Sequence, residues 1–158
     1  MRFADRLDTA KTFISRGLTA PDSALRLNAT VIMLTAGSKL AQAQAYSRAY
    51  PWLEQTLQQV PVRAPGDTTG PRQQVRVNAS FWYGLSSVST LVPVYQAMVG
   101  SKNCDQAKAV NDRIQFTKEA LIRGARVHLP TAQSLLNNLT RFEDQMPAVK
   151  RAFKCRNF

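Results

Sequence analysis

Three residues at equal spacing, Gly37, Ala49 and Pro61, constrain the fold of this chain more than any other feature. They lie twelve residues apart in a stretch whose apolar residues recur at helical spacing. Two packed helices need a small residue where they touch and a second small residue opposite it. Proline then ends the pair, because it cannot donate the next backbone hydrogen bond. The spacing therefore predicts a tight helical hairpin. No catalytic or ligand-binding pattern of comparable clarity occurs elsewhere in the sequence.

Apolar residues at intervals of three and four predict helices along most of the chain. Residues 62–74 contain two Pro and two Gly among polar neighbours and form the expected loop between hairpins. Pro93 and Pro147 are expected to bend the long segments that contain them. The expected helices cover 3–16, 23–40 (capped by Asp22 or Ser23), 44–59, 75–99, 103–123 and 130–153.

Short connections between these segments favour antiparallel neighbours. A chain of 158 residues with 44% hydrophobic content can bury one sizeable core. We therefore predict a single all-α domain over residues 1–158, with about six helices stacked as antiparallel hairpins. Gly17, Gly100 and Gly124 are expected to end their helices, because glycine readily adopts the left-handed conformation of a helix cap.

The segment 30–61 resembles a tetratricopeptide repeat (TPR), a family with a small residue in the first helix, an alanine twelve residues later and a proline twelve after that. The later hairpin, 75–124, follows the same plan with longer helices, and either Gly84 or Ser86 takes the place of the small residue. The resemblance implies an α-solenoid fragment that acts as a non-catalytic protein–protein interaction or assembly scaffold. The alternative is an unrelated helical bundle in which the three positions match by chance.

The first helix has no partner before it in this sequence. In a solenoid it would be the second helix of a preceding unit, and the ends of such arrays need polar caps. It is therefore expected to be either a piece of a longer protein or a terminus folded back onto its neighbour.

The resemblance also implies where a partner would bind, since the first helices of successive TPR units line a concave surface. Phe81, Trp82 and Tyr83 are successive aromatic residues that point about 100° apart on a helix, so they cannot all be core. Trp82 is the candidate among the three for facing a groove or a neighbouring unit, but a core position is the favoured interpretation. Leu34 and Phe81 depart from the Lys, Asn and Arg of the subgroup that clamps peptide carboxylates. The candidate partner-binding residues are Leu34, Ser38, Asn78, Phe81 and Trp82.

The two cysteines, Cys104 and Cys155, open the fifth and close the sixth expected helix. Because these helices are of similar length and should run antiparallel, both thiols return to the same end of the hairpin. The sequence therefore predicts a disulfide, with two reduced thiols in a cytosolic protein as the alternative. A bonded pair favours an extracytoplasmic location, periplasmic or secreted, and nothing else in the sequence indicates a compartment.

The net charge is +11, from 21 Lys and Arg against 10 Asp and Glu. The basic residues are spread from Arg2 to Arg156, and most of them suit a solvated outer face, with a surface for an anionic partner as the alternative. The expected partner is a protein or peptide, and it is acidic in the second case. The alternative function is a basic helical module that binds an anionic polymer or acidic surface, either nucleic acid or membrane, with nucleic acid the less favoured partner. The densest basic group is Lys150, Arg151, Lys154 and Arg156, which also suits the C-terminal end of a helix.

Residues that could carry chemistry are few. His128 is the only histidine and lies at the far end of the last hairpin from both cysteines, so these three cannot complete a zinc site. No phosphate-binding loop and no nucleophile elbow occurs. The uncharged run 77–101 contains too many polar residues for a membrane span. We therefore expect no enzyme activity, no cofactor, no metal and no transmembrane segment.

Overall fold

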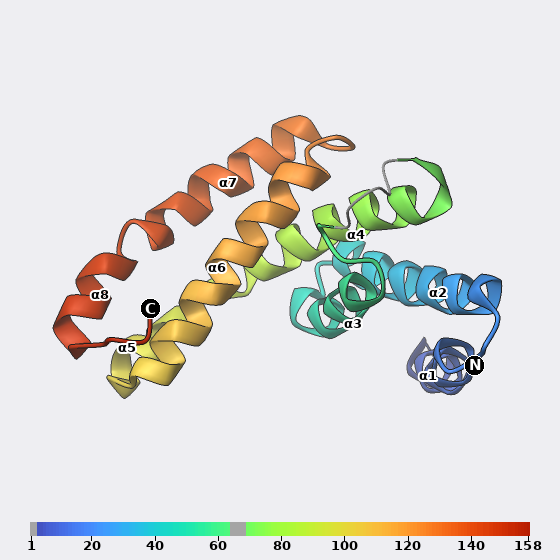
Figure 1. Cartoon of the computed structure of the whole chain (residues 1–158), viewed down its shortest axis with the longest axis horizontal. Coiled ribbons are helices and arrows are strands. Elements are labelled where there is room, and N and C mark those ends of the chain that lie inside the picture. The colour runs from blue at the N-terminus through green and yellow to red at the C-terminus, as the bar shows by residue number, and fades with distance from the viewer. Residues whose placement is uncertain (1–2, 64–68) are drawn as a thin grey trace.

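A computed structural model of the chain describes residues 3–63 and 69–158, which form helices and no strand (Figure 1). The predicted all-α class is confirmed. The helices are α1 (Phe3–Leu18), α2 (Ser23–Gln42), α3 (Tyr46–Gln59), α4 (Gly70–Ser89), α5 (Leu91–Ser101), α6 (Cys104–Gly124), α7 (Leu129–Glu143) and α8 (Met146–Phe153).

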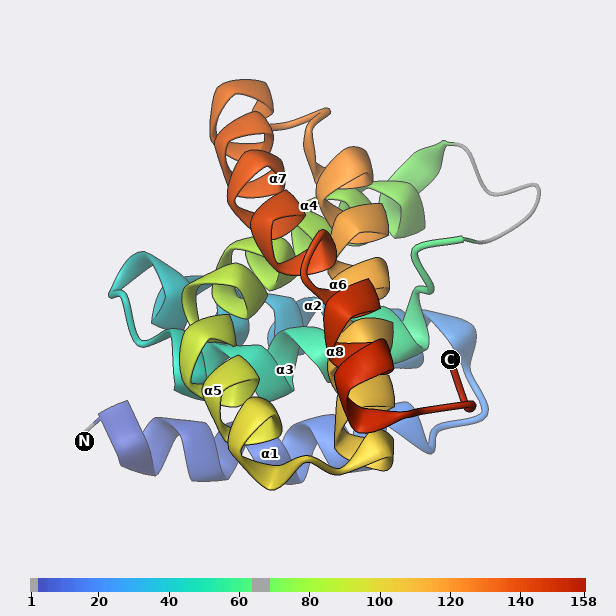
Figure 2. The same ribbon diagram turned by 90° about the vertical axis from the view of Figure 1, so that its left-hand side faces the viewer.

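Helix α4 joins two groups of helices that lie at opposite ends of the molecule. At one end α1 packs on α2, and α2 and α3 form an antiparallel pair against α4. At the other end α6 packs on α4 and carries α5, α7 and α8 (Figures 1 and 2). Each group has its own apolar core, one around Leu40, Leu53 and Tyr83 and the other around Ile114 and Leu139.

The three equally spaced residues take the positions expected of a tight hairpin. Gly37 lies within α2, where an added Cβ would come 2.7 Å from Cγ of Leu53 on α3. Ala49 is fully buried on α3, which ends at Gln59, two residues before Pro61. A small side chain at position 37 thus lets α2 and α3 approach closely. Asp22 caps α2, as predicted, by accepting a hydrogen bond of 2.8 Å from the backbone N–H of Ala24.

Two of the predicted long helices are each divided in two, so the described residues form eight helices where about six were expected. The first division falls at Thr90, and Pro93 lies in the first turn of α5. The second falls between Glu143 and Met146, with Pro147 in the first turn of α8. Proline is tolerated in a first turn, because the N–H it lacks there has no partner in the helix. Each proline therefore starts a new helix.

The predicted loop is shorter than expected, since α4 already begins at Gly70. Residues 64–68 of that loop lie outside the described part of the chain. Two glycines expected to end helices do not. Gly17 lies within α1, where an added Cβ would come 2.6 Å from Cβ of Ala29 on α2. Gly100 lies within α5, and the left-handed residue after that helix is Lys102, with φ of 51°.

Candidate functional site

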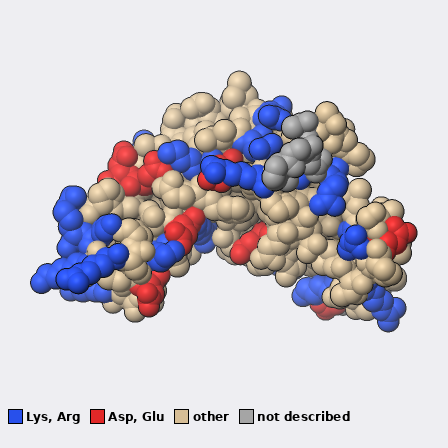
Figure 3. Space-filling view, viewed as in Figure 1, with Lys and Arg blue, Asp and Glu red and all other residues tan. Residues whose placement is uncertain are grey.

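A groove lies between α3 on one side and α5 and α6 on the other, above α4. Its volume is about 420 Å³. Figure 3 shows it as the hollow in the lower edge of the molecule, with acidic side chains on both of its sides. The lining residues are Tyr50 and Glu54 of α3, Tyr83 of α4, Val94 of α5, and Ala109, Val110, Asp112, Arg113 and Phe116 of α6.

Arg113 is the most firmly held polar residue of this groove. Its Nη2 donates to the carbonyl oxygen of Ser87 at 2.9 Å and to Oγ1 of Thr90 at 2.7 Å, and its Nε donates to Oγ of Ser87 at 3.1 Å. These acceptors lie at the C-terminal end of α4, where carbonyl groups lack helical partners and favour a cation. The guanidinium also lies 4.4 Å from the ring centre of Tyr50. Arg113 therefore joins α3, α4 and α6 at the groove wall.

Aromatic rings form the floor of the groove. Tyr83 is buried, and its hydroxyl lies 3.1 Å from that of Tyr50 in a hydrogen bond. Phe116 packs edge-on against Tyr83, with 5.2 Å between ring centres, and keeps 36% of its surface exposed. Burial raises the pKa of Tyr83, as does neighbouring Tyr50, while Thr117 and Arg113 act in the opposite direction. Tyr83 thus stays neutral and keeps its hydrogen bond.

The raised pKa of Tyr83 predicts a loss of stability in alkaline solution. The unfolded chain loses the Tyr83 proton near pH 10, while the folded protein retains it, so stability falls as the pH rises above about 10. Urea unfolding of the wild type and of Tyr83→Phe on both sides of this pH measures the effect. We expect the free energy of unfolding of the wild type to fall more steeply with pH than that of the variant. Groups other than Tyr83 titrate in both proteins, so the difference between the two slopes reports Tyr83. Equal slopes would contradict this.

The groove also carries acidic side chains at its rims. Asp112 pairs with Lys108, and Glu54 is exposed at the opposite rim. Within residues 3–63 and 69–158, no three His, Cys, Asp or Glu side chains gather as ligands for a metal ion. The arrangement of fixed aromatic rings, a fixed guanidinium and acidic rims is suited to binding the side chains of another molecule.

A second groove, of about 640 Å³, lies between α1 and α3. Its lining combines apolar residues such as Leu7, Ile14 and Trp52 with five long polar side chains, Lys11, Arg48, Gln55, Gln58 and Gln59. Holding such side chains in one conformation costs entropy, whereas Arg113 and Tyr50 are already fixed by their own contacts. The α3–α6 groove, lined by the nine residues named above, is therefore the better preformed binding site.

The candidate partner-binding residues lie on α2 and α4 and do not line this groove. Leu34 and Trp82 are half-buried against one core cluster. Ser38 and Asn78 are half-buried as well and satisfy their side chains locally. Ser38 Oγ donates to the carbonyl oxygen of Thr35 at 3.2 Å, and Asn78 Nδ2 donates to that of Gln74 at 2.9 Å.

Phe81 is only 3% exposed, so its ring is not offered to a partner. The ring centre lies 4.4 Å from that of His128, just before α7. Gly124 brings the end of α6 directly against the backbone of Phe81. Phe81 is therefore a packing residue that holds the α6–α7 turn against α4, and His128 is exposed in that turn.

The functional candidates that sequence reasoning missed are Arg113 and Phe116. Both lie off the apolar stripe that includes Val110, Ile114 and Leu121, which faces the core. A phenylalanine outside such a stripe is a signal of an exposed aromatic position. The sequence gives no sign of which helix faces it.

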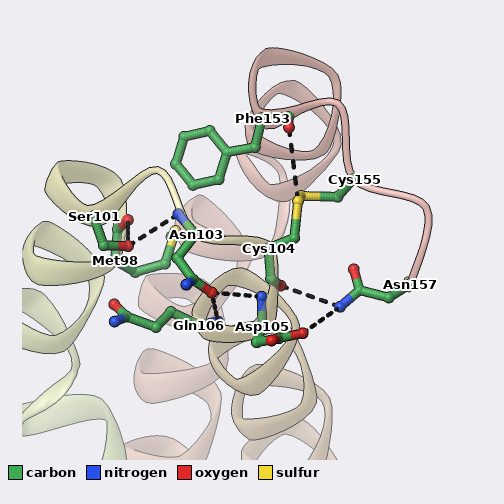
Figure 4. The surroundings of a disulfide bond; sticks show 9 residues. All are labelled: Met98, Ser101, Asn103, Cys104, Asp105, Gln106, Phe153, Cys155 and Asn157. Carbon is green, nitrogen blue, oxygen red and sulfur yellow. Dashed lines mark hydrogen bonds between the residues drawn. A yellow bond between two sulfur atoms is a disulfide. The ribbon is translucent and has the colours of Figure 1, made fainter.

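The predicted disulfide is present, and it ties the end of the chain to the start of α6 (Figure 4). Cys104 and Cys155 are bonded, with 5.4 Å between their Cα atoms. Asn103 caps α6 through its Oδ1, which accepts from the backbone N–H of Asp105 at 2.8 Å. Asn157 donates from Nδ2 to the carbonyl oxygen of Cys104 and to Oδ1 of Asp105, both at 3.3 Å. The tail beyond α8 is thereby fixed on α6.

None of the helices in the described part of the chain combines the length and the apolar character needed to cross a bilayer. Comparisons of the chain with protein families, with curated proteins and with solved structures found no match.

Proposed function

We propose that this chain is a non-catalytic, TPR-like module that binds a protein or peptide partner in the groove between α3 and α6. The observation that carries the proposal is an exposed aromatic ring, Phe116, beside a guanidinium that is already fixed. Arg113 and Tyr50 hold each other at the wall, so a partner that enters meets side chains with little freedom left to lose. Aromatic and Arg side chains are the residue types that contribute most to protein interfaces.

The close contact of α2 and α3 at Gly37 supports the TPR-like part of this proposal. The groove, however, lies on the α3 side of the hairpin, whereas the resemblance places the binding surface on α2 and α4. Leu34 and Trp82 therefore represent a second, separate surface. Substitutions in the α3–α6 groove and on the α2–α4 surface show which of the two binds the partner.

Selection of binders from a random-peptide display library tests the proposal directly. We expect selected peptides to lose about tenfold or more in affinity for Phe116→Ala, because an aromatic contact residue of an interface contributes about 2 kcal/mol. Phe13→Ala is the matched control, since Phe13 is 62% exposed on α1 and lies outside both grooves. Affinity for this control should be unchanged, and binding to the wild type should persist in moderate salt.

Two other outcomes of the same selection count against the α3–α6 groove. If Trp82→Ala weakens the peptides and Phe116→Ala does not, the partner binds the α2–α4 surface instead. If the peptides bind every variant equally, neither surface is the binding site.

The basic C-terminal end favours a second candidate function, attachment to an anionic polymer or acidic surface. Lys150, Arg151, Lys154 and Arg156 form no ion pair within residues 3–63 and 69–158. Figure 3 shows Lys and Arg side chains crowded at that end of the molecule. Binding of this kind is electrostatic and falls steeply with salt. Peptides that are all acidic, released by salt and displaced by short duplex DNA would favour it.

The disulfide supports a location in an oxidising compartment, periplasmic or extracellular. Disulfides persist there and are rare in the reducing cytosol. Mass measurement of the protein purified from its native source, with and without reductant, tests this. Two free thiols in that protein would contradict it.

A further inference from the structure

Arginines gather where Val62 and Arg63, which follow α3, lie beside the C-terminal end of α6. A pocket of about 210 Å³ lies there, and Arg63, Arg123 and Arg126 are in its wall. Figure 3 shows Lys and Arg side chains grouped in the upper middle of the face that it draws. The pocket begins beyond Phe116 along α6, and Arg123 lies ~10 Å further along the helix than that residue. It is therefore separate from the α3–α6 groove.

The positive charge in this pocket exceeds the negative charge. Arg63 pairs with Glu119 through Nη2 and Oε1 at 2.7 Å, so these two charges cancel. Glu119 is the acidic residue of the pocket lining, and its charge is already neutralised by Arg63. Arg123 and Arg126 form no ion pair with any carboxylate within residues 3–63 and 69–158. Two guanidinium groups thus share one wall without a negative partner in it.

A third arginine, Arg76, lies close enough for its charge to act on Arg123. Arg76 is buried and donates from Nε to the carbonyl oxygen of Pro61 at 2.6 Å and from Nη1 to Oε1 of Gln73 at 2.7 Å. Burial lowers the pKa of Arg123, and the charges of Arg126 and Arg76 lower it further. An anion in the pocket would relieve this repulsion.

We propose that the pocket binds a phosphate-type oxyanion, either free phosphate or the terminal group of a small soluble phosphate ester. The planar fork of a guanidinium matches the oxygens of such a group and donates two hydrogen bonds to it. A volume of about 210 Å³ admits one tetrahedral oxyanion together with bound water. Ile122 is 59% exposed at the rim and offers apolar surface to the organic part of an ester. This small-molecule site is independent of the protein-binding function proposed above.

Isothermal titration calorimetry of the full chain at constant ionic strength tests the site, with inorganic phosphate and with phenyl phosphate as separate ligands. We expect saturable binding, weakened about tenfold by Arg126→Gln, because one charge-assisted pair to the anion is lost. Arg141→Gln is the matched control, since Arg141 is exposed on α7 and the charge change is the same. Arg126 is itself exposed, so its substitution should leave the fold intact. Arg123→Gln provides a second variant.

The two ligands distinguish the two sources of the group. Equal affinities indicate a free phosphate site, whereas tighter phenyl phosphate binding indicates an ester, and either result supports the proposal. Absence of saturable heat for both ligands up to ~10 mM would overturn the proposal. The dissociation constant would then exceed that concentration, and the binding free energy would be smaller than about 3 kcal/mol. An Arg141→Gln variant that loses as much affinity as Arg126→Gln would overturn it as well.

Discussion

Removal of the Cys104–Cys155 bond is expected to lower the free energy of unfolding by about 3 to 4 kcal/mol. The bond joins residues 51 apart in the chain and closes a loop that contains α6, α7 and α8. The closed loop lowers the conformational entropy of the unfolded chain. Without the bond this entropy is regained, which favours unfolding. Urea unfolding of the double variant Cys104→Ala/Cys155→Ala measures the change. The double substitution avoids the unpaired thiol that either single substitution would leave.

The effect should be greatest at the C-terminal end. Cys155 is buried, and the tail that follows α8 is held on α6 by Asn157 as well as by the bond. Loss of the bond should therefore increase the hydrogen-exchange rate of α8 more than the rates of α2 and α3, which lie in the other group of helices. Wild-type protein treated with reductant is the control and should match the double variant. A double variant within about 0.5 kcal/mol of the oxidised wild type would show that the bond contributes little to stability.

Gly124→Ala is the second substitution with a large expected effect. A Cβ at this position would come 2.6 Å from Cα and 2.7 Å from the backbone N of Phe81, closer than real Cβ contacts allow. These are backbone atoms of α4, so the clash is relieved only by moving one helix away from the other. Overpacking of this kind costs typically about 1 to 3 kcal/mol and at times more, and the gain from placing alanine in a helix offsets under about 1 kcal/mol. We expect a net loss of about 2 kcal/mol in urea unfolding.

Gly100→Ala is the matched control, because Gly100 also lies in a helix and an added Cβ there meets nothing within 4 Å. It should raise stability by about 0.5 kcal/mol, since alanine restricts the unfolded chain. Gly84→Ala should fall between the two. The atoms it would meet belong to the buried side chain of Leu121, and a side chain can shift with less displacement of the helices than a backbone can. If Gly124→Ala proved as harmless as Gly100→Ala, the close approach of α4 and α6 would be wrong.

Features that depend on residues near each other in the chain could be predicted well. The apolar spacing along 103–123 predicted α6 within one residue at each end, because the periodicity is a property of the helix alone. The pairing of Cys104 with Cys155 followed from two helices of similar length joined by a short turn. In contrast, the bends expected near Pro93 and Pro147 are divisions between two separate helices. The sequence shows where a helix is weakened but not whether the chain bends or begins anew there.

The candidate binding residues were harder to predict, because burial depends on which helix lies opposite. Phe81 and Trp82 are neighbours in the chain, yet the first is buried against the α6–α7 turn and the second is half-exposed. Arg113 gains its role from acceptors at the end of α4, more than twenty residues earlier. No local pattern marks such a pairing.

The sequence by itself determined that this chain is helical, where its first hairpin turns and which cysteines meet, because short-range periodicity and segment length settle those points. Only the tertiary structure decided where α4 places the two groups of helices, and therefore which side chains line the groove and which arginines crowd together. Those positions follow from how closely helices approach one another. That approach is set by residues such as Gly124 and Phe81, which are far apart in the chain and whose contact appears only in the folded molecule.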